Sequence, residues 1–156
     1  VRNHQRKVIN STHVRQQIRE RIATNCTGLT TTGSNVFQSR IYNLESGNLP
    51  CLLIYSKSET SERLTMQPTD SLNRDLDVVV EGYVRATTID DTLDTISAEV
   101  EVAIASDPTC NDLAIDTFLS STEIDYDGEG DQPIGVVRMT WSVNYETKTT
   151  VPTTAL

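Results

Sequence analysis

The chain has 156 residues, of which 37% are hydrophobic and only 5% aromatic, and its formal net charge is −9. A chain of this length typically forms one domain whose core needs neither disulfides nor metals. No apolar run reaches the roughly 18 residues that a membrane-spanning helix requires, and the basic start lacks the apolar stretch of a secretory signal. We therefore expect one domain over residues 1–156, with no membrane contact.

The charge is distributed unevenly along the chain. Residues 1–21 contain six basic residues and one acidic residue, a balance of +5, whereas the remainder contains seven basic and 21 acidic residues, a balance of −14. Nucleic-acid affinity comes largely from lysine and arginine, so the acidic body is a poor DNA binder. Charge alone leaves two interpretations open: an ordinary soluble surface, or a surface that DNA slides past without sticking.

Three cysteines, Cys26, Cys51 and Cys110, lie far apart and show no C-x-x-C spacing. An odd number without a pattern favours reduced, buried thiols in a cytosolic setting over a metal site or a disulfide.

The first predicted element is a helix from about Asn10 to Cys26. Residues 1–9 show no clean period and predict a basic arm or an extension of the helix. In the helix, apolar residues recur at four-residue spacing: Val14, Ile18 and Ile22. Gly28 suits the left-handed position just past its end.

Two strands follow, at Val36–Tyr42 and Cys51–Ser56, and the intervening turn-rich segment predicts a hairpin-like connection. Residues 57–74 are polar and contain one proline. They predict a long exposed loop or a loose hairpin, and such segments in compact domains are usually functional or disordered.

The second half contains the clearest patterns. Alternation from Leu76 to Ala86 predicts a strand. Thr88 then offers an N-cap, and a helix follows that ends near Asp107-Pro108. Its apolar stripe has spacings of four, three, four and three: Ile89, Leu93, Ile96, Val100 and Ala103/Ile104.

Two more strands are expected, from Phe118 to Asp127 and over residues 137–146, joined by the turn 127–130. Residues 148–156 have no core pattern and predict an extended tail. The fold class is therefore α+β: a single, mostly antiparallel or mixed sheet of about five strands, with two helices on one face.

Candidate chemistry is sparse. The acids of DYDGEGD, residues 125–131, begin like a calcium loop, but Val136 stands where a bidentate glutamate is needed, so a turn between strands is favoured. His4 and His13 lack a companion nucleophile or acid. We expect no enzyme, no cofactor and no metal. A metal-dependent hydrolase that combines segment 123–131 with His13 is kept as a distant alternative.

The order of motifs resembles that of the tail terminator proteins, the lambda-type minor tail proteins of long-tailed bacteriophages. The resemblance covers roughly residues 10–147 and leaves out the basic arm and the tail. Its motifs run in this order: Arg15-Gln-Gln-Ile18, Val36-Phe37, Leu49-Pro50 leading into Leu52-Leu-Ile-Tyr55, Leu76-Asp-Val-Val-Val80, Leu93-Asp-x-Ile96 and Thr140-Trp-Ser-Val143-Asn-Tyr145.

This resemblance implies a structural virion protein. Family members form a hexameric ring that ends tail-tube polymerisation and joins the tail to the head while DNA passes through. The implied partners are copies of the chain, the tail tube protein and the head–tail connector or neck proteins. The implied location is the head-proximal end of the tail, after assembly in the host cytoplasm. Another neck component, such as a connector or completion protein, is the nearest alternative.

Within this reading, specific residues receive expected roles. The candidates for contact with the tube or neck lie in the polar segment: Lys57, Glu59, Glu62, Arg63 and Arg74. The channel-lining candidates lie on the second helix: Asp91, Asp94 and Glu99, with the turn 123–131 as the alternative lining. The basic arm and the extended tail are expected to contact neighbouring subunits.

Overall fold

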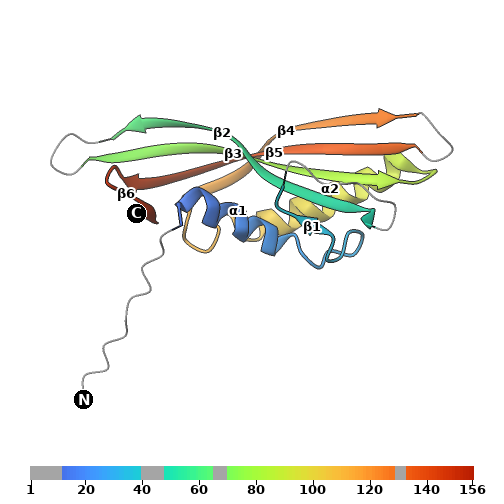
Figure 1. Cartoon of the computed structure of the whole chain (residues 1–156), viewed down its shortest axis with the longest axis horizontal. Coiled ribbons are helices and arrows are strands. Elements are labelled where there is room, and N and C mark those ends of the chain that lie inside the picture. Colours follow the sequence, from blue (N-terminus) through green and yellow to red (C-terminus); the bar gives the residue numbers. More distant parts are fainter. Residues whose placement is uncertain (1–11, 40–47, 65–69, 129–132) are drawn as a thin grey trace, which may run out of the picture.

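The structure is a computed structural model that describes residues 12–39, 48–64, 70–128 and 133–156. Within these ranges, two helices are each followed by three strands: α1 (Val14–Asn25), β1 (Val36–Phe37), β2 (Cys51–Arg63), β3 (Ser71–Arg85), α2 (Ile89–Ala105), β4 (Asp116–Asp127), β5 (Ile134–Lys148) and β6 (Val151–Ala155). Both helices lie on one side of a long twisted sheet (Figure 1). The predicted α+β class is confirmed.

The strands form one sheet in the order β1-β2-β3-β5-β4, and β6 pairs with β5 outside this path. All pairings are antiparallel except that of β1 with β2, where Val36 lies opposite Leu52 in parallel register. The hairpin-like connection predicted between these two strands was therefore wrong. Residue patterns identify strands but not their direction, and the segment between the two is long enough for the crossover that parallel pairing needs.

The core lies between the helices and the inner face of the sheet. The apolar stripes predicted for both helices are buried, as are the alternating residues of the last strand from Val137 to Tyr145. Gly28 has the expected left-handed backbone, with φ of 88°. No helix in the described ranges is long and apolar enough to cross a membrane.

Two glycines let α2 approach the sheet closely. A Cβ atom on Gly135 would lie 2.2 Å from Ile89 Cγ2, and one on Gly82 would lie 2.9 Å from Ile96 Cγ2. Such separations are far below van der Waals contact, so a side chain at either position would push the helix away.

The three cysteines are free and buried, as predicted. Burial raises the pKa of the Cys26 thiol to about 12 and that of the Cys51 thiol to about 11. These thiols are protonated at neutral pH and behave as small apolar core groups.

Residues 57–74 do not form a long loop. β2 runs to Arg63 and β3 begins at Ser71, with Arg63 paired to Leu72. Of the two predicted forms, the hairpin is therefore confirmed and the long loop was wrong. Of its tip, residues 65–69 lie outside the described ranges. The polar sequence gave no strand signal because both faces of this hairpin end carry polar groups. The neighbouring strand β5 supplies the hydrogen bonds that hold β3 extended, with Leu72 opposite Thr147.

The predicted extended tail, residues 148–156, turns back as β6 and pairs with the end of β5, with Lys148 opposite Val151 and Thr147 opposite Ala155. The side-chain amide of Gln17 in α1 donates to the Thr153 carbonyl at 3.0 Å. This segment therefore packs on its own subunit.

Candidate assembly surfaces

The β2–β3 hairpin is fixed to the body by a cluster of two arginines and a tyrosine around Glu59. Its carboxylate accepts hydrogen bonds from Arg15 Nη1 at 2.7 Å, from Arg74 Nη1 at 3.2 Å and from the Tyr145 hydroxyl. The Glu59 side chain is 9% exposed. Because these partners come from α1, β3 and β5, the cluster ties the hairpin to both layers of the fold.

Two further contacts strengthen this cluster. Arg74 Nε donates to Thr147 Oγ1 at 3.1 Å, and its guanidinium carbon lies 5.9 Å from the centre of the Tyr145 ring. Burial, followed by the hydrogen bond to Glu59, raises the pKa of Tyr145, so its hydroxyl remains a proton donor to the carboxylate.

His13 caps the first turn of α1 beside the same cluster. Its Nδ1 accepts a hydrogen bond from the Arg15 backbone N–H at 3.0 Å. Burial, then the positive charges of Arg15 and Arg74, lower the pKa of His13, while Glu59 opposes them. The cap requires an unprotonated Nδ1, which agrees with the direction of this shift.

The five predicted contact residues divide into two groups. Glu59 and Arg74 belong to the anchoring cluster and are largely buried. Lys57, Glu62 and Arg63 are exposed on β2, and Arg63 also lies 3.7 Å from the Asp70 carboxylate. Only the second group is positioned to meet a partner, and that role stays a prediction.

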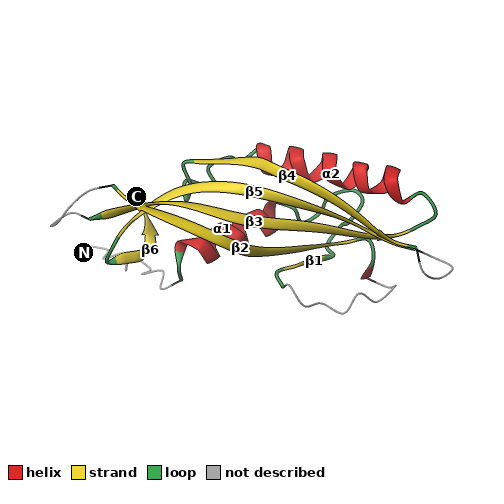
Figure 2. Cartoon of the chain, turned by 90° about the horizontal axis from the view of Figure 1, so that it is seen from above, coloured by secondary structure: helices red, strands yellow, loops and turns green. Residues whose placement is uncertain are grey.

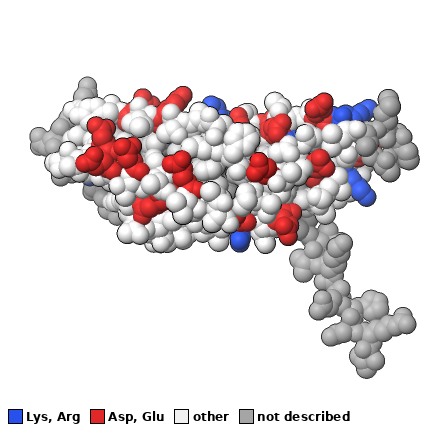
Figure 3. All heavy atoms as spheres, turned by 180° about the vertical axis from the view of Figure 1, so that it is seen from behind, with Lys and Arg blue, Asp and Glu red and all other residues white. Residues whose placement is uncertain are grey.

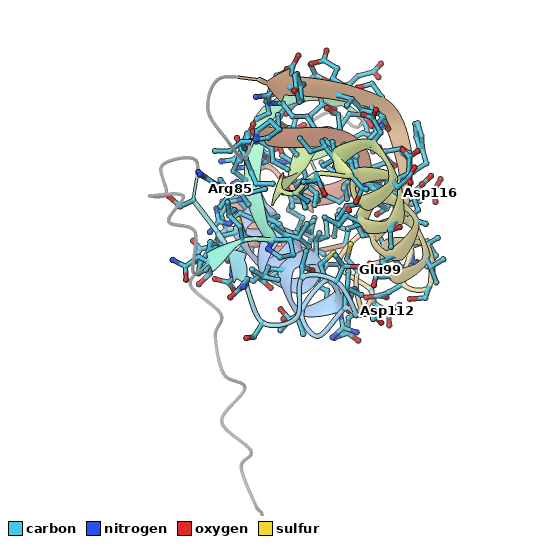
Figure 4. All side chains as sticks on the ribbon, turned by 90° about the vertical axis from the view of Figure 1, so that its right-hand side faces the viewer. Arg85, Glu99, Asp112 and Asp116 are labelled. Carbon is cyan, nitrogen blue, oxygen red and sulfur yellow. The ribbon has the colours of Figure 1, made fainter. Side chains whose placement is uncertain are left out.

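The three predicted channel residues do not share one face of α2. Asp91 and Asp94 are exposed, whereas Glu99 is half-buried and accepts a hydrogen bond from the Thr31 backbone N–H at 3.0 Å. At about 100° per residue, Asp94 and Glu99 point about 140° apart around the helix. Figure 4 labels Glu99 on the side of α2 that faces the turn after α1. Seen from behind, the molecule carries acidic side chains across much of its surface and few basic ones (Figure 3).

The outer face of the sheet carries a second ion cluster, which sequence reasoning missed. Glu81, 7% exposed, accepts hydrogen bonds from the hydroxyls of Tyr55 and Tyr83, and Arg138 Nε lies 3.7 Å away. Arg138 also pairs with Asp125. Burial, then the contact with Glu81, raises the pKa of Tyr83 to about 12. The sequence signal that could have indicated this cluster is the presence of polar residues at alternate positions of strands that are otherwise apolar.

This cluster borders a hollow of about 240 Å³ between side chains of β2, β3, β4 and β5. Among the described residues, no helix covers the outer face of the sheet, which Figure 2 shows from above. The outer face of the sheet is therefore a broad polar surface whose paired charges hold its side chains in place.

The groups proposed for hydrolysis lie far apart. His13 lies near Arg74, which is opposite Tyr145 of β5 in the strand register. Asp125 is opposite Val136, which is near the other end of β5. Positions 145 and 136 are separated by roughly 30 Å at 3.3 Å per residue. Within the described ranges, no group of three or more histidine, cysteine, aspartate or glutamate side chains could hold a metal ion. The acids at 129 and 131 lie outside those ranges.

The described residues form a small α+β domain: a long sheet, stiffened by two ion clusters, with polar surfaces on its outer face and at the hairpin. Residues 12–145 match the phage minor tail protein U family, and the chain belongs to this family. It is thus a structural component of a bacteriophage tail, and the resemblance inferred from the motifs is confirmed.

Two other comparisons add little. A chain from a structure described as the virion of a native gene transfer agent particle is 12% identical, with a TM-score of 0.40, and the alignment covers 86% of this chain and 92% of that one. This likeness is too low to support an argument about function. No curated protein matches the chain.

Proposed function

We propose that six copies of this protein form a ring that ends polymerisation of the tail tube and joins the tail to the head, leaving a channel for DNA. The observation that carries the proposal is the family match over residues 12–145, which spans every element from α1 to most of β5. Assembly takes place in the host cytoplasm, and the finished ring lies at the head-proximal end of the tail.

A ring can stop growth when its two faces differ. Subunits joined by heterologous contacts close into such a ring if the rotation between neighbours is 60°. The chain has two unlike ends, since the β2–β3 hairpin and the β4–β5 hairpin lie at opposite ends of the sheet (Figure 1). One end binds the tube, and the other offers no surface for a further tube subunit.

The β2–β3 hairpin is the part that contacts the tube. Glu59 and Arg74 hold it rigid from inside, while Lys57, Glu62 and Arg63 present charges of both signs. Charge matching of this kind sets the orientation and the rate of docking more than the affinity. Because the hairpin is anchored to α1 and β5, little conformational entropy is lost on binding.

The acidic body supports DNA passage. Asp91 and Asp94 are the channel-lining candidates that remain exposed, whereas Glu99 is engaged with the turn after α1. Like-charge repulsion keeps DNA from adhering to the wall, and at 0.1 M salt it extends over about 10 Å.

Solution mass and tube length together test the proposal. The purified chain, mixed with tail tube protein, is expected to give a species of six-fold mass at tube ends and to halt elongation in electron micrographs. A chain that binds heads but leaves tube length uncontrolled would support another neck component instead. A chain that binds neither tubes nor heads would contradict the proposal.

A further inference from the structure

α2 and the turn that follows α1 enclose an apolar groove of about 450 Å³ on the helical side of the molecule. Its walls include Leu29 from the turn and Ala98, Val102 and Ala103 from α2. Val102 is 72% exposed, the highest exposure among the large apolar residues of the described ranges. Exposing such a side chain inside a concave apolar surface is typical of a binding site.

The groove wall also carries a negative charge. Glu99 lines the groove, and one of its carboxylate oxygens accepts a hydrogen bond from the Thr31 N–H at 3.0 Å. A cation that docks beside this carboxylate is attracted to it across a partly apolar surface, where screening by water is reduced. The groove therefore suits a segment that combines apolar side chains with a positive charge.

We propose that this groove binds residues 6–9, Arg-Lys-Val-Ile, of a neighbouring copy of the chain. The segment lies in the basic arm, in which residues 1–11 contain Arg2, Arg6 and Lys7 and no acidic residue. Val8 and Ile9 fill the apolar groove, and Arg6 or Lys7 supplies the positive charge beside the Glu99 carboxylate. Charge complementarity selects this occupant, since the surrounding body is strongly acidic.

The occupant comes from another subunit because the same chain is too short. Val8 lies four residues before Thr12, a reach of at most about 14 Å. α1 extends about 18 Å over its 12 residues, and the turn that lines the groove follows its far end. Val8 and Ile9 therefore cannot enter their own groove while α1 is folded.

This inference rests on the proposed ring, in which each arm would bind the next subunit and the last would close on the first. A binding segment joined to a ring contact acts at a high effective concentration, so even a short segment stabilises the closed ring.

Disulfide trapping in assembled rings tests the inference. One chain carries Ile9→Cys and a second, distinguished by a mass tag, carries Ala98→Cys. The native cysteines are buried and add little background. Mild oxidation of mixed rings is expected to link the two chains of unlike mass. As a control, Phe118→Cys replaces Ala98→Cys, since Phe118 is 55% exposed on β4 outside the groove, and no link should form.

A second measurement uses Val102→Glu, which places a charge in the groove without touching the core. It should raise the protein concentration needed for ring formation roughly tenfold or more, as expected for lost burial of one apolar side chain. The matched variant Ile124→Glu, at a residue 53% exposed on β4, should leave it unchanged. Rings that form without the Ile9–Ala98 link would overturn the arm assignment and leave the proposed function standing. Absence of rings under all conditions would remove both.

Discussion

At the scale of the residue, Gly135 determines how closely α2 can pack on β5. The Cβ of any other residue would lie 2.2 Å from Ile89 Cγ2, at the first turn of the helix, where neither backbone can retreat without breaking the strand pairing or the apolar stripe. The absence of a side chain is therefore a packing requirement here.

We expect Gly135→Ala to lower the free energy of unfolding by about 1–3 kcal/mol, the usual cost of overpacking a core. Chemical denaturation monitored by circular dichroism measures the change. Gly128→Ala is the control: its Cβ would meet only the ring of Tyr126, which is 65% exposed and can move aside. Equal stability of both variants would mean that α2 can shift without loss.

His13 gives a pH dependence whose sign follows from its environment. Its folded-state pKa lies below the ordinary value near 6.5, chiefly through burial and the charges of Arg15 and Arg74, with Glu59 acting against them. As the pH falls below about 6.5, the unfolded chain takes up a proton that the folded chain resists. The contribution of His13 to the free energy of unfolding is thus fully present above about pH 6.5 and decreases on acidification.

We expect the unfolding free energy of the native chain to fall more between pH 7 and pH 5 than that of His13→Asn. Asparagine keeps an N-cap acceptor but does not titrate in this range. Because all other groups are common to both proteins, the difference between the two curves isolates His13. Parallel curves would show that the histidine titrates equally in the folded and unfolded states.

At the scale of the element, the β2–β3 hairpin carries two groups of charges: one holds the hairpin in place, and the other is proposed to contact the tube. Its inner charges, Glu59 and Arg74, are paired and buried, whereas its outer charges are exposed. Removing a member of the first group leaves a buried charge without its partner. Replacing Arg63 would likewise take a cation away from the buried Asp70 carboxylate, 3.7 Å from it, whereas the exposed residues Lys57 and Glu62 can be replaced at little cost to the free subunit.

We therefore expect two different outcomes. Glu59→Gln should lower the unfolding free energy by about 1–3 kcal/mol. The double variant Lys57→Ser, Glu62→Ser should melt within a few degrees of the native chain yet fail to cap tubes, as judged by tube length in micrographs. The matched control is the double variant Arg85→Ser, Asp116→Ser, which removes one basic and one acidic exposed residue from other parts of the sheet and should cap normally. Normal capping by the hairpin variant would contradict its contact role.

At the scale of the whole molecule, net charge governs the encounter with DNA. The isolated chain should show no measurable affinity for duplex DNA at moderate salt, because its body carries far more acidic than basic groups. In the particle, repulsion between these acidic groups and the DNA phosphates would act along the channel wall.

The double variant Asp91→Lys, Asp94→Lys tests whether this face of α2 lines the channel. Particles should assemble but eject DNA more slowly, and the delay should be largest at low salt, where screening is weakest. Glu99 is left intact because it holds the turn after α1. Unchanged ejection from particles with confirmed rings would move the channel wall elsewhere on the subunit.

Local periodicity was enough to predict much of the fold. The stripe from Ile89 to Ile104 and the alternation from Val137 to Tyr145 specify which face each element buries, and the structure places both in the core. This information is local, because a residue's neighbours within one or two turns determine whether it can be buried. The order of motifs then indicated the family.

The strand pairings and the Glu59 cluster could be determined only from the tertiary structure. The parallel pairing of β1, the pairing of the polar hairpin and the return of β6 each depend on hydrogen bonds to a strand elsewhere in the chain. The Glu59 cluster joins residues 44 and 86 positions apart, to Arg15 and Tyr145. A local sequence pattern does not identify such partners, because a glutamate looks the same in the sequence whether its carboxylate faces solvent or accepts three part-buried hydrogen bonds.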